Sequence, residues 1–311
     1  MQLSTPIDIT PHRLIDYSRP FLLLGSCFSE HIGSRLLESR FPGCVNPFGV
    51  LYNPQSILQA LQRLWENHPF TADELIHAGG LWHSFMHHGS FSSADADTTL
   101  QHINSAYSQS ALRIAETKTY LITFGSSWVY EYEGKVVANC HKMPQKAFTQ
   151  RRLTVDEIVL PWKQMIAQIQ QQVPDAEFLF TVSPIRYREH GPLAAGTNKA
   201  VLLLAVEQLV SLPGVHYFPS YEIMMDELRD YRFYAADMIH PSDVAVGYIW
   251  ERFKATQLTR EAQTLLPRIE HLTKQLAHRP LHPDSDESRR FQQKLQEEIA
   301  LLKQQYPYLN L

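Results

Sequence analysis

Short apolar runs alternate with longer stretches of helical periodicity along the chain. The runs 21–24 (FLLL), 119–124 (TYLITF) and 177–182 (EFLFTV) are short and followed by Gly or Ser, which predicts three buried strands. Segment 215–222 predicts a further strand that leaves into a loop. Segment 43–54 predicts a short strand, a turn and a loop.

Apolar residues at helical spacing predict six helices in the same part of the chain, with start signals at three of them. Ser29 is a plausible N-cap, Pro54 opens its helix, and Thr154 with Glu157 forms a capping-box pattern. The expected helices are 29–41, 54–67, 98–116, 154–172, 194–210 and 241–253. The stretch from about 70 to 97 has no clear period and predicts strands and loops.

The alternation of strands with helices of ten to twenty residues predicts an α/β fold with a mainly parallel sheet. In such sheets ligands bind in the crevice beyond the carboxyl ends of the strands. The segments 25–27 (GSC), 125–127 (GSS) and 183–186 (SPIR) follow the three clearest strands, so we expect the ligand site among them.

The C-terminal part has a different pattern. Apolar residues recur at helical spacing over 265–276 and again over 291–302, and HRPLHPDSD (278–286) interrupts them. This predicts a helical hairpin, packed on the main domain or on a partner such as a second copy of the chain. The expected domains are 1–257 and 258–311.

Charge and composition exclude several classes of partner. The 311 residues carry a net charge of −4 from 28 basic and 32 acidic residues without long runs of either sign, so no nucleic-acid footprint is expected. Three widely spaced cysteines do not form a disulfide framework. With no signal-peptide pattern and no apolar run of membrane-spanning length, we expect a reduced, cytoplasmic protein that does not contact membranes.

Two groups of residues could carry chemistry. Cys27 lies in a strand-to-helix turn, where the helix dipole would lower the thiol pKa and backbone N–H groups could hold an oxyanion. Alternatively, it is a small residue buried between helix and sheet. Asp237 and His240 could form the base half of a triad, with Asp237 orienting the imidazole. Alternatively, they are a loop Asp and one of 15 histidines brought together by chance.

These motifs resemble the GSCFA family over roughly residues 15–255. GSCF occupies the strand-to-helix turn, and DMIHP precedes the last helix of the α/β region. Further stretches typical of the family are NPFGVLYNP, FGSSWVYE, NCHKMP, SPIRY and YFPSYEIMMDELRDYRFYAADMIHP. The family in turn resembles the SGNH (GDSL-like) hydrolases, which include esterases, lipases and carbohydrate acyl-ester hydrolases or acyltransferases.

The resemblance implies a flavodoxin-like, SGNH-type three-layer fold with helices on both faces of the sheet. It also implies an acyl-enzyme mechanism. Cys27 takes the place of the SGNH serine nucleophile, and a one-residue slip would put Ser26 there instead. The same comparison makes Asp237 and His240 the acid–base pair.

The resemblance also places the oxyanion hole. Gly49 is the counterpart of the glycine whose N–H contributes to it, and Ser127 stands where SGNH enzymes have an asparagine.

Other polar residues could line the same crevice and bind a carboxylate, a phosphate or a sugar acid. Each residue taken alone also has a structural explanation: Lys142 and Arg186 as ordinary surface charges, and His83, in the same segment as His88, as a packed core histidine. The candidates are His88, Asn139, His141, Lys142 and Arg186. The expected partner is a small-molecule or carbohydrate ester.

Metal and cofactor sites have little support in the sequence. Cys27, Cys140, His88, His141 and His240 could in principle bind zinc, but none of the usual ligand spacings is present. No dinucleotide fingerprint or P-loop occurs, so neither a metal nor a cofactor is expected. Because two of the SGNH motifs are altered, the alternative is a catalytically degenerate protein that binds a small anionic or sugar ligand.

Overall fold

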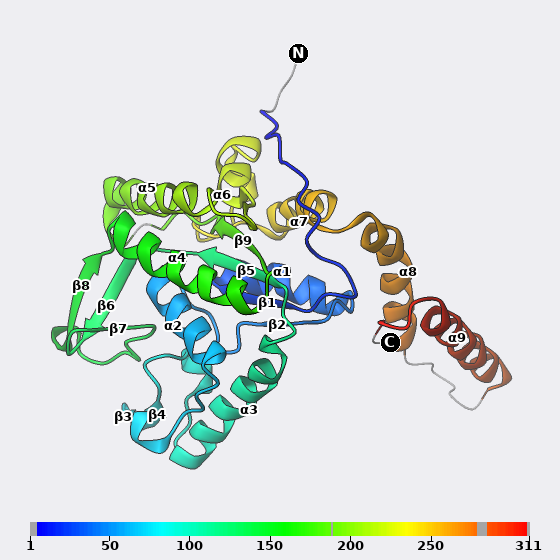
Figure 1. Ribbon diagram of the computed structural model, residues 1–311, viewed down its shortest axis with the longest axis horizontal. Coiled ribbons are helices and arrows are strands. Elements are labelled where there is room, and N and C mark those ends of the chain that lie inside the picture. Colours follow the sequence, from blue (N-terminus) through cyan, green and yellow to red (C-terminus); the bar gives the residue numbers. More distant parts are fainter. Residues whose placement is uncertain (1–4, 188, 279–284, 310–311) are drawn as a thin grey trace.

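Five parallel strands form the central sheet of the computed structural model, which describes residues 5–187, 189–278 and 285–309 (Figure 1). The strands, in sheet order, are β10 (Val215–Tyr217), β9 (Glu177–Val182), β5 (Thr119–Phe124), β1 (Phe21–Gly25) and β2 (Gly43–Val45). Counted from the β2 edge, the chain order of these strands is 2-1-3-4-5, which is the flavodoxin-like order. The predicted fold class is therefore confirmed.

Each central strand is buried on both faces, which explains its uninterrupted apolar sequence. Successive side chains of a strand point to opposite faces. Accordingly, Leu22 and Leu24 belong to one hydrophobic core and Phe21 and Leu23 to the other. The sheet thus separates two cores, each closed by helices.

Helices cover both faces of the sheet (Figure 1). The first core contains residues of α2 (Pro54–Trp65), α3 (Ala96–Ile114), α4 (Val155–Gln172) and α5 (Gly191–Leu209). The second core contains residues of α1 (Cys27–Glu38) and α7 (Asp243–Gln257). Three layers result, as expected.

Helix α1 begins two residues earlier than predicted. Ser26 is the N-cap, with extended backbone angles, and Ser29 N donates to Ser26 O at 2.8 Å to close the first turn. The assignment of Ser29 as N-cap is therefore wrong, and Ser29 is buried inside the helix. The consequence for the site is that Cys27 is the first residue of α1.

The fourth predicted strand is shorter than the sequence suggests. Strand β10 ends at Tyr217, and the chain turns into α6 (Ser220–Glu222) and a π-helical turn, Ile223–Glu227. Pro219 explains this end, because proline has no N–H to donate to a sheet ladder.

Two small antiparallel sheets lie outside the central one. Strands β3 (Ile76–Ala78) and β4 (Leu81–His83) form a hairpin within 70–97, which confirms the prediction of strands and loops there. The other sheet has the order β7-β6-β8, and the sequence analysis missed it. Its strands are β6 (Trp128–Tyr132), β7 (Lys135–Val137) and β8 (Phe148–Arg152).

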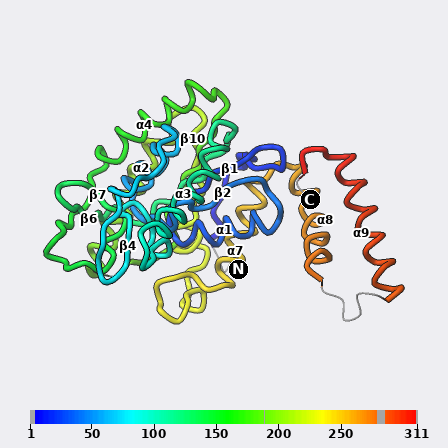
Figure 2. Tube along the Cα trace, turned by 90° about the horizontal axis from the view of Figure 1, so that it is seen from below, coloured from blue at the N-terminus to red at the C-terminus, as the bar shows by residue number. Residues whose placement is uncertain are grey.

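The predicted C-terminal hairpin is confirmed as α8 (Arg260–Ala277) and α9 (Asp286–Gln305), which lie together at one side of the molecule in both views (Figures 1 and 2). Residues of both helices join the second core, so the hairpin packs on the main body. Most of the predicted interruption, 279–284, lies outside the described residues. The domain boundary at 257/258 stays a prediction. In the described part of the chain, every helix is too short or too polar to cross a bilayer.

Candidate active site

The loop after β2 ties together the carboxyl ends of the two central strands. Asn46 Oδ1 accepts from Gly25 N at 2.9 Å, and Leu51 N donates to Gly25 O at 2.9 Å. Tyr52 O accepts from Gly125 N at 2.8 Å and from Ser126 N at 2.9 Å. These bonds give a structural role to the NPFGVLYNP stretch. They join the ends of β1 and β5, the point where the strand order reverses and where such folds bind ligands.

Gly25 allows the chain to leave β1 at this point. Its φ is +150°, and a Cβ at this position would lie 2.4 Å from Thr123 O. Only glycine fits such a conformation and contact. The sharp turn places Cys27 at the N-terminus of α1.

Cys27 and Ser26 differ in exposure. Ser26 is 0% exposed, and its hydroxyl has no hydrogen-bond partner within the described residues. Cys27 is partly exposed. Burial nevertheless raises the pKa of the Cys27 thiol, and the opposing effect of the Phe28 N–H is smaller. The net shift is thus opposite to the predicted lowering, because loss of hydration outweighs the hydrogen bonds from the backbone N–H groups of Phe28 and Cys27.

Lys199 is a site residue that the sequence analysis missed. It lies on α5, is 3% exposed, and donates from Nζ to Gly125 O at 3.0 Å and to Ser183 O at 2.8 Å. Burial lowers the pKa of Lys199 to about 7, and Cys27 is the strongest charged group acting on it. A signal was present: Lys199 precedes Leu202 and Val206 by three and seven residues, on the buried stripe of its helix.

Asp237 and His240, which the sequence predicts to act together, are in contact. Asp237 Oδ2 lies 2.6 Å from His240 Nδ1, and both side chains are about half exposed, at 47% and 48%. Asp237 Oδ1 accepts from the backbone N–H groups of His240 and Ile239, and these bonds, together with the imidazole, lower the pKa of Asp237 to about 2. In the described structure no hydrogen bond joins His240 to Cys27.

The two predicted oxyanion donors besides Cys27 already have partners. Gly49 N donates to Asn46 O at 2.7 Å. Ser127 is buried, and its N and Oγ approach Asn198 Oδ1 at 2.6 and 2.7 Å. Gly49 and Ser127 therefore hold the loops, and the backbone N–H groups at the start of α1 are the remaining candidates for an oxyanion hole.

Two asparagines that the sequence analysis did not select lie at the same edge of the sheet. Asn46 and Asn198 are buried, and their carbonyl oxygens accept the bonds from Gly25 and Ser127. The amide nitrogens of both side chains have no partner among the residues described. Asparagine has no spacing rule that marks it in a single sequence.

A pocket of about 480 Å³ contains three of the predicted substrate residues, His88, Asn139 and Lys142. We call it the Tyr52 pocket. Its aromatic lining residues are Tyr52, Tyr130 and Phe148. Burial raises the pKa of Tyr52, and the Cys27 thiol raises it further. Cys27 itself is not one of the residues that line the pocket.

His141, the fourth predicted substrate residue of this region, does not line the Tyr52 pocket. Its ring stacks on His83 at 4.3 Å, and its Nε2 lies 2.8 Å from Ser84 O. Burial lowers the pKa of His141 to about 4. His83 is itself buried against Ser92 and Ala78, as expected for a packed core histidine.

Arg186 lies elsewhere, in a second pocket of about 730 Å³ that also contains Met225, Tyr234 and Met238. We call this the Arg186 pocket. Arg186 N donates to Ile239 O at 3.3 Å, so this pocket is built from the loop that carries His240. The structure thus places His88, Asn139 and Lys142 in one pocket and Arg186 in another, while His141 lines neither.

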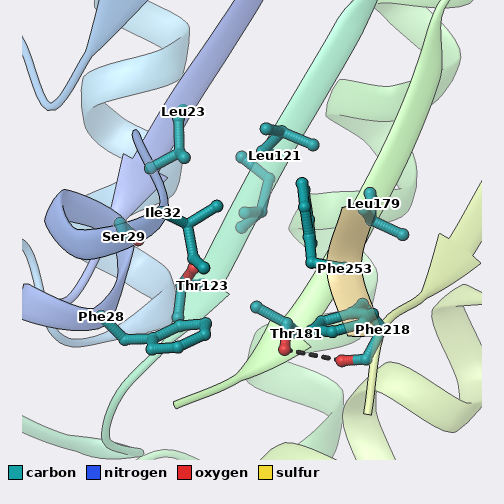
Figure 3. A pocket seen from close by; sticks show the side chains of 11 residues that line it. Leu23, Phe28, Ser29, Ile32, Leu121, Thr123, Leu179, Thr181, Phe218 and Phe253 are labelled. Carbon is teal, nitrogen blue, oxygen red and sulfur yellow. Dashed lines mark hydrogen bonds between the residues drawn. The ribbon is translucent and has the colours of Figure 1, made fainter. Parts of the chain in front are cut away.

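A third, much smaller cavity of about 20 Å³ lies against the sheet and is lined by Ser29, Thr123, Thr181 and apolar side chains (Figure 3). Thr181 Oγ1 donates to Phe218 O there, at 2.6 Å. Such a cavity has room for one water molecule and for no substrate. Over residues 5–187, 189–278 and 285–309, no group of three or more His, Cys, Asp or Glu side chains could hold a metal ion.

The site motifs agree with the family comparison. The model of the GSCFA family matches residues 20–253, and that of the GSCFA domain protein, C-terminal domain, matches 269–311. The chain belongs to the GSCFA family.

Among solved structures, this GSCFA protein is similar to the Clostridium thermocellum family 3 carbohydrate esterase. The TM-score is 0.35 at 9% identity, covering 82% of this chain and 98% of that one. A similarity at this level does not extend an activity to this chain. No curated protein matches the sequence.

Proposed function

We propose that this GSCFA protein is an acyl-ester hydrolase or acyltransferase that forms a covalent acyl-enzyme on Cys27. The observation that carries the proposal is the placement of Cys27. It is the partly exposed first residue of α1, at the point where the strand order reverses, and its thiol acts electrostatically on Tyr52, one of the residues that line the Tyr52 pocket. Ser26, the alternative nucleophile, is buried beneath it.

The reaction has two halves. The Cys27 sulfur adds to the acyl carbonyl while the S–H proton passes to a base, and the oxyanion is held by N–H groups at the start of α1. The C–O bond to the leaving alcohol then breaks, and the alcohol oxygen takes up a proton, leaving a thioester. Water or a second alcohol attacks the thioester and restores the thiol. His240, oriented by Asp237 at 2.6 Å, is the base predicted from the sequence.

A carbohydrate O-acyl ester is the substrate class that suits the Tyr52 pocket best. Its lining combines Tyr52, Tyr130 and Phe148 with the polar side chains of Asn139 and Lys142. Aromatic walls pack on the apolar faces of a ligand, while a few placed polar groups fix its orientation.

A non-catalytic binding protein is the second candidate. Two observations favour it: burial raises the pKa of the Cys27 thiol, and within the described residues Cys27 and His240 share no hydrogen bond. In that case the Tyr52 pocket would bind a small anionic or sugar ligand, with Lys142 as its charged contact.

Acyl-enzyme trapping separates the two candidates. The protein is mixed with p-nitrophenyl acetate or an O-acetylated monosaccharide, quenched in acid, and digested for mass spectrometry. We expect one acetyl group on the peptide that contains Cys27, and none in Cys27→Ala. Ser26→Ala is the matched control and should still acylate. If wild type and Cys27→Ala both bind the sugar saturably and neither is acylated, the protein is a non-catalytic binding protein.

A further inference from the structure

Lys199 is a buried lysine without an ion-pair partner. Its side chain is 3% exposed, and no carboxylate of the described residues forms a salt bridge with it. Lysine is almost never fully buried unless it is paired, because transfer of the ammonium group out of water is costly. The acyl-enzyme chemistry proposed above gives Lys199 no task, so its position needs another explanation.

The two hydrogen bonds of Lys199 orient its nitrogen. Nζ donates to Gly125 O at 3.0 Å and to Ser183 O at 2.8 Å, the carbonyl groups just beyond the ends of β5 and β9. A neutral amine has two N–H bonds and one lone pair. Both N–H bonds are therefore used, and one tetrahedral position is left for the lone pair or for a third proton. This arrangement suits a group that gains and loses a single proton.

Lys199 lies beside the turn that carries Cys27, because its Nζ donates to Gly125 O and a Cβ at Gly125 would lie 3.2 Å from the Cβ of Ser26, the residue before Cys27. The titratable groups that act on the amine are Cys27 from α1 and Glu222 from α6. Glu222 is already engaged, because Tyr217 OH lies 2.9 and 2.8 Å from its two oxygens. The Tyr221 ring, centred 5.4 Å from Nζ, covers another side of the amine. The thiol is thus the neighbouring group with a proton to exchange.

We propose that Lys199 is the base that takes the thiol proton of Cys27 in the acylation half-reaction. The inference rests on the proposed acyl-enzyme function and refines it. The S–H bond breaks and an N–H bond forms, giving a thiolate and an ammonium group. The thiolate adds to the acyl carbonyl. When the C–O bond breaks, the leaving alkoxide takes the proton from the ammonium group, and the neutral amine is restored.

This assignment leaves the Asp237–His240 pair for the second half-reaction. The pair is about half exposed, on the loop that builds the Arg186 pocket, and is therefore accessible to an incoming water or alcohol. His240 takes the proton of that acceptor as its oxygen attacks the thioester, and passes it to the departing Cys27 sulfur. A low pKa of Lys199, about 7, supports the first step, because a base must be unprotonated to act near neutral pH.

Alkylation of Cys27 by iodoacetamide tests the inference without any substrate. The rate is followed by mass spectrometry of the Cys27 peptide across the pH range in wild type, Lys199→Met, Lys118→Met and His240→Ala. Lys118 is the matched control, an exposed lysine paired with Asp175 at the opposite end of β5.

We expect Lys199→Met to slow alkylation at least about tenfold near neutral pH and to move the midpoint of the pH profile upward by about one unit, because the thiolate loses its cationic neighbour. Lys118→Met and His240→Ala should match wild type. If His240→Ala slows alkylation and Lys199→Met does not, the thiol proton goes to His240; the inference is then overturned while the proposed function stands. If the alkylation rate is unchanged in both Lys199→Met and His240→Ala, Lys199 is not coupled to Cys27 and the inference is also overturned.

A second measurement covers the case in which Lys199→Met does not fold, since this lysine also holds two loops. Lysine is labelled with ¹³C at Cε, and the Lys199 resonance is titrated in wild type and in Cys27→Ala. A titration midpoint that falls when the thiol is removed supports a shared proton. Identical midpoints contradict it. Acetylation of Cys27 is measured in parallel, so that failure of the proposed function itself is seen separately.

Discussion

At the scale of single residues, exposure distinguishes the two neighbouring nucleophile candidates. Ser26 is 0% exposed and its hydroxyl is unpartnered in the described structure, while Cys27 is partly exposed. We expect Ser26→Ala to keep the esterase rate within about twofold and to leave stability unchanged or slightly higher, since a buried hydroxyl without a partner is costly. Cys27→Ala should abolish turnover. A large loss of rate in a fully folded Ser26→Ala protein would reverse the assignment.

Asp237 has a role that can be tested separately from that of Cys27. Its carboxylate lies 2.6 Å from His240 Nδ1 and fixes which ring nitrogen carries the proton. Asp237→Asn should keep acylation of Cys27 but slow deacylation by up to about 10⁴-fold, the loss seen when the orienting Asp of a triad is replaced by Asn. Quench-flow mass spectrometry would then show the acetyl-Cys27 species accumulating. Equal deacylation rates in Asp237→Asn and wild type would remove the pair from the mechanism.

Motifs predicted some site residues and could not predict others. Cys27, Asp237 and His240 lie in short motifs, and the structure places the last two in contact. Helical spacing places Lys199 on the buried stripe of α5, but it does not show that Lys199 and Asn198 meet the strand ends when α5 packs on the sheet. Ser127 could be located from its motif, but its hydrogen bonds to Asn198 depend on a residue 71 positions away.

At the scale of elements, the turn between β1 and α1 depends on a single glycine. Gly25 has φ +150°, and a Cβ there would lie 2.4 Å from Thr123 O. We expect Gly25→Ala to destabilise the fold by about 2–4 kcal/mol, through strain in the backbone and displacement of β5. Urea unfolding measures the change, and Gly196→Ala is the matched control.

Gly196 lies inside α5 with open space around its Cα. Alanine there should stabilise the helix by about 0.5–1 kcal/mol. If Gly25→Ala were as stable as Gly196→Ala, the turn would tolerate a side chain and the argument for its geometry would fail.

The elements predicted best are those whose own apolar pattern or capping residues identify them in the sequence. Runs such as 119–124 are apolar on both faces and can only be central strands, and the Thr154–Glu157 capping box forms as expected. The sheet of β6, β7 and β8 was missed because its strands are only partly buried and are rich in charged residues. The start of α1 was misplaced because Ser26 caps the helix through its backbone conformation, without a side-chain bond.

At the scale of the whole molecule, buried histidines connect stability to pH. His87 is 1% exposed, stacks on Phe48 at 4.9 Å, and has no partner for its Nε2 in the described structure. Burial lowers the pKa of His87 to about 3. Burial also lowers the pKa values of His141 and His12, so the three act in the same direction.

The direction of the pH dependence follows from the number of protons that the folded and the unfolded chain bind. An unfolded histidine titrates near pH 6.5, whereas folded His87 stays neutral down to about pH 3. Between these values the unfolded chain binds more protons, so the free energy of unfolding falls as the pH falls below about 6.5. At about pH 4.5, two units below the pKa of an unfolded histidine, His87 alone should lower the free energy of unfolding by about 3 kcal/mol, at 1.36 kcal/mol per unit.

Urea unfolding at neutral pH and near pH 4.5 measures this loss in wild type, in His87→Leu and in His102→Gln, an exposed control on α3. His87→Leu should lose less stability on acidification than wild type by about 3 kcal/mol, even if its stability at neutral pH is lower, because leucine has no proton to bind. His102→Gln should follow wild type. If His87→Leu and wild type lose equal stability, His87 must become protonated inside the folded protein, and the Phe48–His87 packing would have to open to water well before the chain unfolds.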